Sequence, residues 1–292
     1  QASTEAGVGS GGEQPAQNAA RSDPNRTFTF QELKQIAGTG VLDNLMSFIS
    51  SNEGGLEAFN RGTSSDSPGD LTGPSNREWS YIDWPLFASV TEGGAEPKKL
   101  TQLTLDEISQ IQRGGNTVAV VNMSPATSVA SPPSGDDKRG IFAVGRFQFV
   151  PATLRGAIAN TSVPRNTLFD ETTQKALGAY LFLAKPDRPS MGAYLVGKYD
   201  YVEWAAQDVA REWSSQPLQF NEAGRQTGQS RYEDLVPPHT TEQVVEALRE
   251  ARAAMLGNAT VMGILEAKNL MDQTTPETSG AGEEEEEIET AE

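Results

Sequence analysis

The sequence predicts a mainly α-helical protein of the α+β class: a helical domain with a small β-hairpin region and disordered terminal tails. Three observations support this fold class. Apolar residues recur three and four apart in several stretches, which places them on one face of a helix. Helix-capping patterns precede some of these stretches, and glycine- and proline-rich turns are concentrated in one part of the chain.

The expected helices follow from these patterns in chain order. The first begins at Thr29-Phe30-Gln31-Glu32, where a threonine three residues before a glutamate can form a capping box. A second box at Thr104-Leu105-Asp106-Glu107 opens another helix, and Pro151 suits a first helical turn. The full set of expected helices is Thr29–Ala37, Val41–Glu53, Thr104–Gln112, Pro151–Asn160, Asp170–Ala184, Pro189–Leu195, Tyr201–Trp213, Thr241–Leu256 and Thr260–Met271.

The β region is expected within residues 60–121. Glycines and prolines interrupt residues 60–99, so we expect loops there with a small hairpin or short helical turns. The valine-rich run Val118–Val121 is typical of a strand, and a Ser/Pro-rich loop follows it to about residue 139.

Composition divides the chain into four segments. Residues 1–26 are low in complexity and are expected to be disordered, and Gln1 indicates a processed or trimmed terminus. Residues 27–235 form the main domain, and residues 236–272 form a C-terminal helical extension. Residues 273–292 are an acidic tail, which we also expect to be disordered.

The charge and residue content exclude several classes of function. The formal net charge is −17, and nine acids without a base lie from Asp272 onward, so the rest of the chain carries −8. No basic stripe is present, so we expect no nucleic acid as a partner. No apolar run reaches the length of a membrane span. The chain has no cysteine, one histidine (His239, expected in a loop) and no phosphate- or dinucleotide-binding fingerprint, so we expect no metal and no cofactor.

Glu53 is the main candidate for chemistry. It follows the apolar stretch that begins at Val41, and Gly54 and Gly55 allow a sharp turn directly after it. A carboxylic acid against an apolar wall has a raised pKa and can donate its proton near neutral pH, as sugar-cleaving enzymes require. The alternative is an exposed glutamate before a glycine that ends the helix.

Five motifs in order resemble one known family. They are Ser51-Asn52-Glu53-Gly54-Gly55 with Phe59-Asn60-Arg61-Gly62; Leu103 to Ile108 with Gln110 and Gln112; Phe142-Ala143-Val144-Gly145-Arg146-Phe147-Gln148-Phe149-Val150-Pro151; Phe169-Asp170 to Gln174 with Ala176-Leu177; and Trp213-Ser214-Ser215-Gln216-Pro217 with Gly228 to Tyr232. Together they are similar to the phage lysozyme-type glycoside hydrolases. This group comprises bacteriophage muramidases and lytic transglycosylases, with the lambda endolysin a distant relative.

The resemblance implies a lysozyme-like fold for residues 27–235 and roles for several residues. Glu53 would be the general acid. The stretch Gly145, Arg146, Phe147, Gln148 would form one wall of the substrate cleft, with Phe147 packing on a sugar face. Gln148 would bond either the substrate or backbone groups around the cleft. Asn60 and Gln174, in the matching motifs, are further candidates for substrate binding.

The second carboxylate and the reaction type stay open. Asp66, Asp70 and Asp83 lie in the turn-rich region, and a hydrolase would use one of them to activate water or stabilise the cation. A lytic transglycosylase needs none of them, because the hydroxymethyl oxygen of the sugar itself attacks. The sequence is compatible with both reactions.

The expected function is cleavage of the bond between N-acetylmuramic acid and N-acetylglucosamine in peptidoglycan. The long polar tails and the acidity favour a virion-associated enzyme, with other virion proteins as partners of the tails, over an endolysin that passes from the host cytoplasm to the periplasm. The alternative function is a non-catalytic structural virion or tail protein that keeps the fold as a glycan-binding or assembly module.

Overall fold

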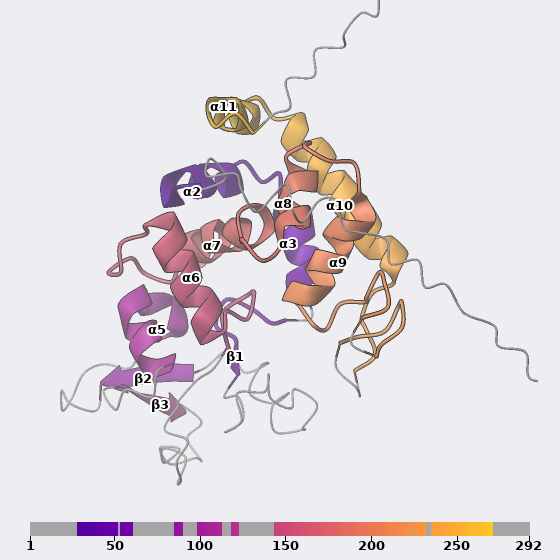
Figure 1. Cartoon of the computed structure of the whole chain (residues 1–292). Helices are drawn as coiled ribbons and strands as arrows, with labels where there is room; N and C mark the ends of the chain where they lie inside the picture. Colours follow the sequence, from indigo (N-terminus) through magenta and orange to yellow (C-terminus); the bar gives the residue numbers. More distant parts are fainter. Residues whose placement is uncertain are drawn as a thin grey trace, which may run out of the picture.

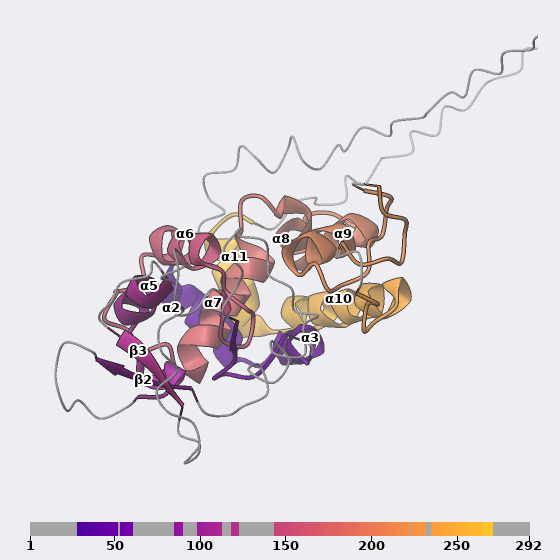
Figure 2. The same cartoon turned by 90° about the horizontal axis from the view of Figure 1, so that it is seen from below.

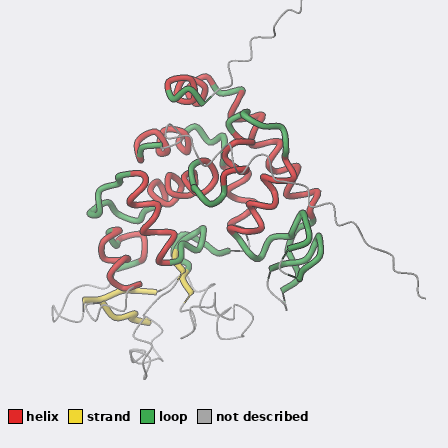
Figure 3. Tube along the Cα trace, viewed as in Figure 1, coloured by secondary structure: helices red, strands yellow, loops and turns green. Residues whose placement is uncertain are grey.

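The computed structural model describes residues 28–51, 53–60, 85–89, 98–112, 118–122, 143–222, 224–231 and 235–270. Both expected terminal tails lie outside these residues. The prediction of a mainly helical protein is confirmed, and Figure 3 shows strands only at one end of the described part. The helices are α2 (Phe30–Gly38), α3 (Asp43–Ser50), the 3-10 turn η2 (Leu100–Gln102), α5 (Leu105–Gln112), α6 (Pro151–Thr161), α7 (Glu171–Leu183), α8 (Pro189–Leu195), α9 (Val202–Glu212), α10 (Thr241–Leu256) and α11 (Ala259–Ala267).

Side-chain caps set the starts of several helices. The Thr29 hydroxyl accepts from the Glu32 N–H, and the Glu32 carboxylate accepts from the Thr29 N–H, so the predicted capping box is present at α2. The Asp170 carboxylate caps α7 by accepting from the Thr173 N–H. Such caps satisfy backbone donors that the first helical turn leaves unpaired, and this is why the expected starts were close to the observed ones.

Helix α7 is the centre of the packing. It contacts α2, α6 and α8, and in Figure 1 it lies between α2 and α6; Figure 2 shows the same helices from below. Every residue from Ala176 to Leu183 is buried, because neighbouring helices cover more than one face of α7. Helix α7 therefore connects the α5–α6 side of the core with the α8–α9 side.

The C-terminal helices belong to the same core. Helix α10 packs against α3, α8 and α9, and α11 reaches back to α2. Val244, Leu248 and Met255 of α10 are fully buried in the hydrophobic cluster that also contains Leu45 of α3. The Lys268 ammonium lies 3.0 Å from the Glu32 carboxylate, beside the start of α2. The C-terminal extension thus buries one face of α3, the helix that leads to Glu53.

The strands pair over long distances in the sequence. Strand β1 (Phe59–Asn60) pairs with β4 (Ala143–Val144), and β2 (Pro85–Ser89) pairs with β3 (Val118–Asn122), both antiparallel. The strand predicted at Val118–Val121 is therefore present. A small hairpin was expected within residues 60–99. Strand β2 instead pairs with β3, which follows α5 in the sequence.

Two helices end more than one residue from the predicted position. Helix α3 ends at Ser50, and the following turn, rather than the helix, carries Glu53. The apolar periodicity stops at Ile49, and the Ser51 hydroxyl donates to the Phe48 carbonyl at 2.8 Å, which satisfies one of the last carbonyls of α3. Helix α11 ends at Ala267 rather than at Met271. Among the described residues, no helix is both long and apolar enough to cross a membrane.

Candidate active site

Glu53 lies in a tight turn directly after α3. The backbone N–H groups of Glu53 and Gly54 both donate to the Ser50 carbonyl, at 3.2 and 3.1 Å. Gly54 has φ +126°, and a methyl group added there would lie 2.5 Å from the Ala58 Cβ, so only glycine fits. The turn therefore depends on Gly54 and places the Glu53 side chain just beyond the C-terminal end of α3.

The Glu53 carboxyl is partly buried and has a raised pKa. Burial is the main cause, because it removes the water that would stabilise the charged form. One contact opposes the effect of burial: the Ser215 hydroxyl donates to Glu53 Oε1 and so favours the carboxylate. The net result is a carboxyl group that keeps its proton at a higher pH than an exposed glutamate does.

This raised pKa predicts a pH-dependent stability difference between the wild type and Glu53→Gln. A group whose pKa is higher in the folded state stabilises the fold at low pH and loses this contribution as the pH rises through the folded pKa. Glutamine does not titrate. We expect the variant to gain stability relative to the wild type as the pH rises above about 4, the ordinary pKa of glutamate. Urea unfolding at several pH values measures this difference, and a difference that stays constant with pH would contradict it.

A tight turn at residues 145–148 lies beside Glu53. Val144 and Phe149 exchange two backbone hydrogen bonds, at 3.2 and 2.9 Å, which close this turn. The Gly145 N–H donates to the Ala58 carbonyl at 2.7 Å, in line with the β1–β4 pair. The segment that follows Glu53 and the predicted cleft-wall segment are therefore neighbours, although about 90 residues separate them in the sequence.

Gln174 ties the two segments together from inside the core. Its amide nitrogen donates to the carbonyls of Leu56 and Phe169, at 2.9 and 3.0 Å, and its amide oxygen accepts from the Arg146 N–H at 2.8 Å. The side chain is completely buried. The prediction that Gln174 contacts substrate is therefore wrong for this structure, because three backbone partners use its amide and no surface is exposed.

Phe147 also differs from its predicted role. Its ring is only 2% exposed and packs against Phe149, Phe182 and Trp213, with ring centroids 6.1 to 6.5 Å apart. A methyl group added at Gly178 would overlap the ring, so α7 makes room for it with a glycine. The expectation that Phe147 packs on a sugar face is corrected: it is a core residue that anchors the turn.

Gly145 and Arg146 act as scaffold in the described structure. Gly145 has φ +71°, and a side chain there would overlap Gln174 and Phe169, so its role is close packing within the protein. The Arg146 guanidinium donates to the hydroxyls of Ser50 and Ser47, at 2.8 and 3.0 Å. These bonds hold the turn against the last turn of α3.

Gln148 is the residue of this turn that is best placed to contact a ligand. It is partly exposed, and its amide nitrogen lies 3.8 Å from where a side chain at Gly54 would begin, next to Glu53. The amide donates to the Gly145 carbonyl at 3.0 Å, so it also bonds a backbone group at the edge of the turn. Its φ of +50° is unusual for a residue other than glycine, and the backbone adopts this conformation within the tight turn at residues 145–148.

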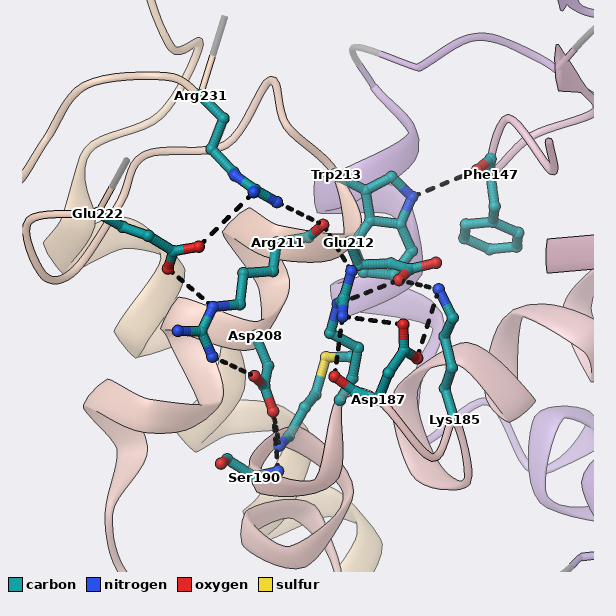
Figure 4. Close-up of polar contacts among 12 residues, drawn as sticks. Phe147, Lys185, Asp187, Ser190, Asp208, Arg211, Glu212, Trp213, Glu222 and Arg231 are labelled. Carbon is teal, nitrogen blue, oxygen red and sulfur yellow. Dashed lines mark hydrogen bonds and ion pairs between the residues drawn. The ribbon is translucent and has the colours of Figure 1, made fainter. Parts of the chain in front are cut away.

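Hydrogen bonds and ion pairs hold the residues directly before Ser215 (Figure 4). The Trp213 indole N–H donates to the Phe147 carbonyl at 3.3 Å, which joins the end of α9 to the 145–148 turn. Around it, buried Glu212 pairs with Lys185 and Arg188, and Arg211 pairs with Glu222 at 2.8 Å. Ser215 itself was not assigned a role by the sequence. The only signal was its place in the Trp213–Pro217 motif.

The candidates for the second carboxylate, Asp66, Asp70 and Asp83, lie outside the described residues. Asn60 is described only as part of β1, where it pairs with Ala143. His239 lies in a loop, as expected, and stacks on Phe48 with ring centroids 3.8 Å apart. Within the described part of the chain, no cluster of three or more histidine and acidic side chains could hold a metal ion.

Comparison with known proteins gives no relative. The sequence matches no protein-family model, no curated protein and no solved structure. The geometry around Glu53 and the motifs in the sequence are therefore the basis for a functional assignment.

Proposed function

We propose that this chain is a lysozyme-like glycosidase that cleaves peptidoglycan between N-acetylmuramic acid and N-acetylglucosamine, with Glu53 as the general acid. The observation that carries the proposal is the environment of that carboxyl. It is partly buried, its pKa is raised by burial, and it lies beside the 145–148 turn and Gln148. A glycosidase needs such a group to protonate the leaving oxygen near neutral pH.

The proposed reaction begins with transfer of the Glu53 proton to the glycosidic oxygen. The bond between this oxygen and the anomeric carbon of N-acetylmuramic acid breaks, and positive charge develops on the sugar ring. The resulting Glu53 carboxylate accepts a hydrogen bond from the Ser215 hydroxyl, and this bond stabilises the negative charge. The cation is then captured either by water, which gives a reducing end, or by the sugar's own hydroxymethyl oxygen, which gives an anhydro end. In both cases the attacking oxygen loses its proton to the Glu53 carboxylate, which restores the acid.

The scaffold around Glu53 supports this role. Gln174, Arg146 and Phe147 use their side chains to hold the two loops together, so that Glu53 and Gln148 keep a fixed relation. Fixed geometry is what allows a general acid to act on a bound substrate. We further propose, from the acidity and the polar tails, that the enzyme is associated with the virion and acts on the host cell wall.

The test is digestion of purified sacculi by the full chain. We expect the turbidity of the suspension to fall and soluble muropeptides to appear, with mass spectrometry showing cleavage after N-acetylmuramic acid. Reducing ends would identify a hydrolase, and anhydro ends a lytic transglycosylase. If folded protein released no muropeptide, the enzymatic proposal would be wrong, and the structural virion module would become the favoured function.

A further inference from the structure

We propose that Ser215 is a positioning residue that holds the Glu53 carboxyl in one orientation and determines which of its oxygens carries the transferable proton. This inference rests on the proposed function of Glu53. Its basis is a contact between residues 162 positions apart: the Ser215 hydroxyl, in the loop after α9, donates to Glu53 Oε1.

The direction of this bond has a chemical consequence. A neutral carboxylic acid has one oxygen that carries hydrogen and one that accepts. When Oε1 accepts the hydroxyl of Ser215, the proton of the neutral acid belongs on Oε2. Ser215 therefore directs the acidic hydrogen to Oε2, the oxygen that the serine does not bond.

Ser215 can do this because its own position is fixed. It is 8% exposed, and the residues on either side of it are anchored. The Gln216 N–H donates to the Trp213 carbonyl at 2.8 Å, and the Ser214 carbonyl accepts from the Ser230 hydroxyl at 2.7 Å and the Arg231 N–H at 3.2 Å. A donor held in this way loses little freedom when it orients another group.

The bond also tunes the acidity of Glu53. A donor to the carboxylate lowers the pKa, and here it opposes the effect of burial. Without the hydroxyl, Glu53 would hold its proton to a higher pH, and its carboxyl group would be free to rotate. The alkaline limb of the pH–rate profile reports the loss of this proton, so it should move to higher pH when the hydroxyl is removed.

The experiment compares Ser215→Ala, Ser215→Thr and the neighbouring control Ser214→Ala, with kcat/KM on sacculi measured across pH. We expect Ser215→Ala to be slower by about tenfold at the optimum, as for loss of one hydrogen bond to a charged group, with its alkaline limb at higher pH. Ser215→Thr keeps a hydroxyl and should keep the wild-type limb. Ser214 contributes its carbonyl to the network, so Ser214→Ala should match the wild type.

A second readout does not depend on activity. Carbon-13 NMR of the Glu53 carboxyl should show a higher pKa in Ser215→Ala than in the wild type and in Ser214→Ala. An unchanged limb and an unchanged Glu53 titration in Ser215→Ala would overturn the inference. If Glu53→Gln were inactive in the same experiment, Glu53 would still be the acid and only the role of Ser215 would fail. If Glu53→Gln kept full activity, the proposed function of Glu53 would fail instead.

Discussion

Replacing Glu53 by glutamine is expected to slow the digestion of sacculi by about 10²- to 10⁴-fold, the usual contribution of a general acid. Glutamine has nearly the same shape and can still accept the Ser215 hydroxyl, but it has no proton to deliver. The effect should therefore appear in kcat, and the KM for the glycan should change little. The rate of muropeptide release, measured by chromatography, gives this ratio.

The matched control is Glu57→Gln, the same change four residues further along the same loop. The Glu57 carboxylate accepts from the Thr101 N–H at 3.2 Å and from the Thr101 hydroxyl, so its hydrogen-bond partner is Thr101, whereas that of Glu53 is Ser215. We expect this variant to keep activity within a few fold of the wild type. Equal activity of Glu53→Gln and the wild type, with both folded, would remove Glu53 from the mechanism.

Truncating Phe147 to alanine is expected to lower the free energy of unfolding by about 3–5 kcal/mol, the usual loss for a large aromatic side chain in a core. The ring is 2% exposed and contacts three other aromatic rings, so its removal leaves a cavity that these neighbours cannot easily fill. Urea unfolding followed by circular dichroism measures the loss. Phe147→Leu, which keeps most of the volume, should lose less, about 1–2 kcal/mol.

This result separates the two roles of Phe147, core residue and sugar contact. A core residue changes stability and leaves binding of the glycan to the folded fraction unaltered. A residue that packs on a sugar would do the reverse. If Phe147→Ala had the stability of the wild type and a raised KM, the placement of the ring in the core would be wrong.

The sequence predicted most of the helices because their signals are local. Thr29 with Glu32, Asp170 before α7 and Pro151 at the start of α6 each act within one helical turn, and each marks the observed start. The end of α3 was placed too late, because Asn52 and Glu53 do not themselves break a helix. The end of α3 is evident only from the structure of the turn around Gly54, which packs closely against Ala58.

The site was less predictable because its contacts are long-range. The motifs assigned Glu53 and the 145–148 turn to one site, but they could not show which side chains of that turn face the core. The Phe147 ring can be buried because Gly178 leaves space for it. No residue close to Phe147 in the sequence indicates this contact. Ser215 meets Glu53 across 162 residues, and its role depends on how α9 ends rather than on any local pattern.

The central claim is that the Glu53 carboxyl keeps its proton to a higher pH than an exposed glutamate does. Its most direct test is a carbon-13 NMR titration of the glutamate carboxyl groups in the full chain, with the Glu53 signal assigned by its absence from Glu53→Gln. We expect this signal to titrate clearly above the exposed glutamates, because burial raises its pKa. A Glu53 signal that titrated together with those of the exposed glutamates would contradict the claim.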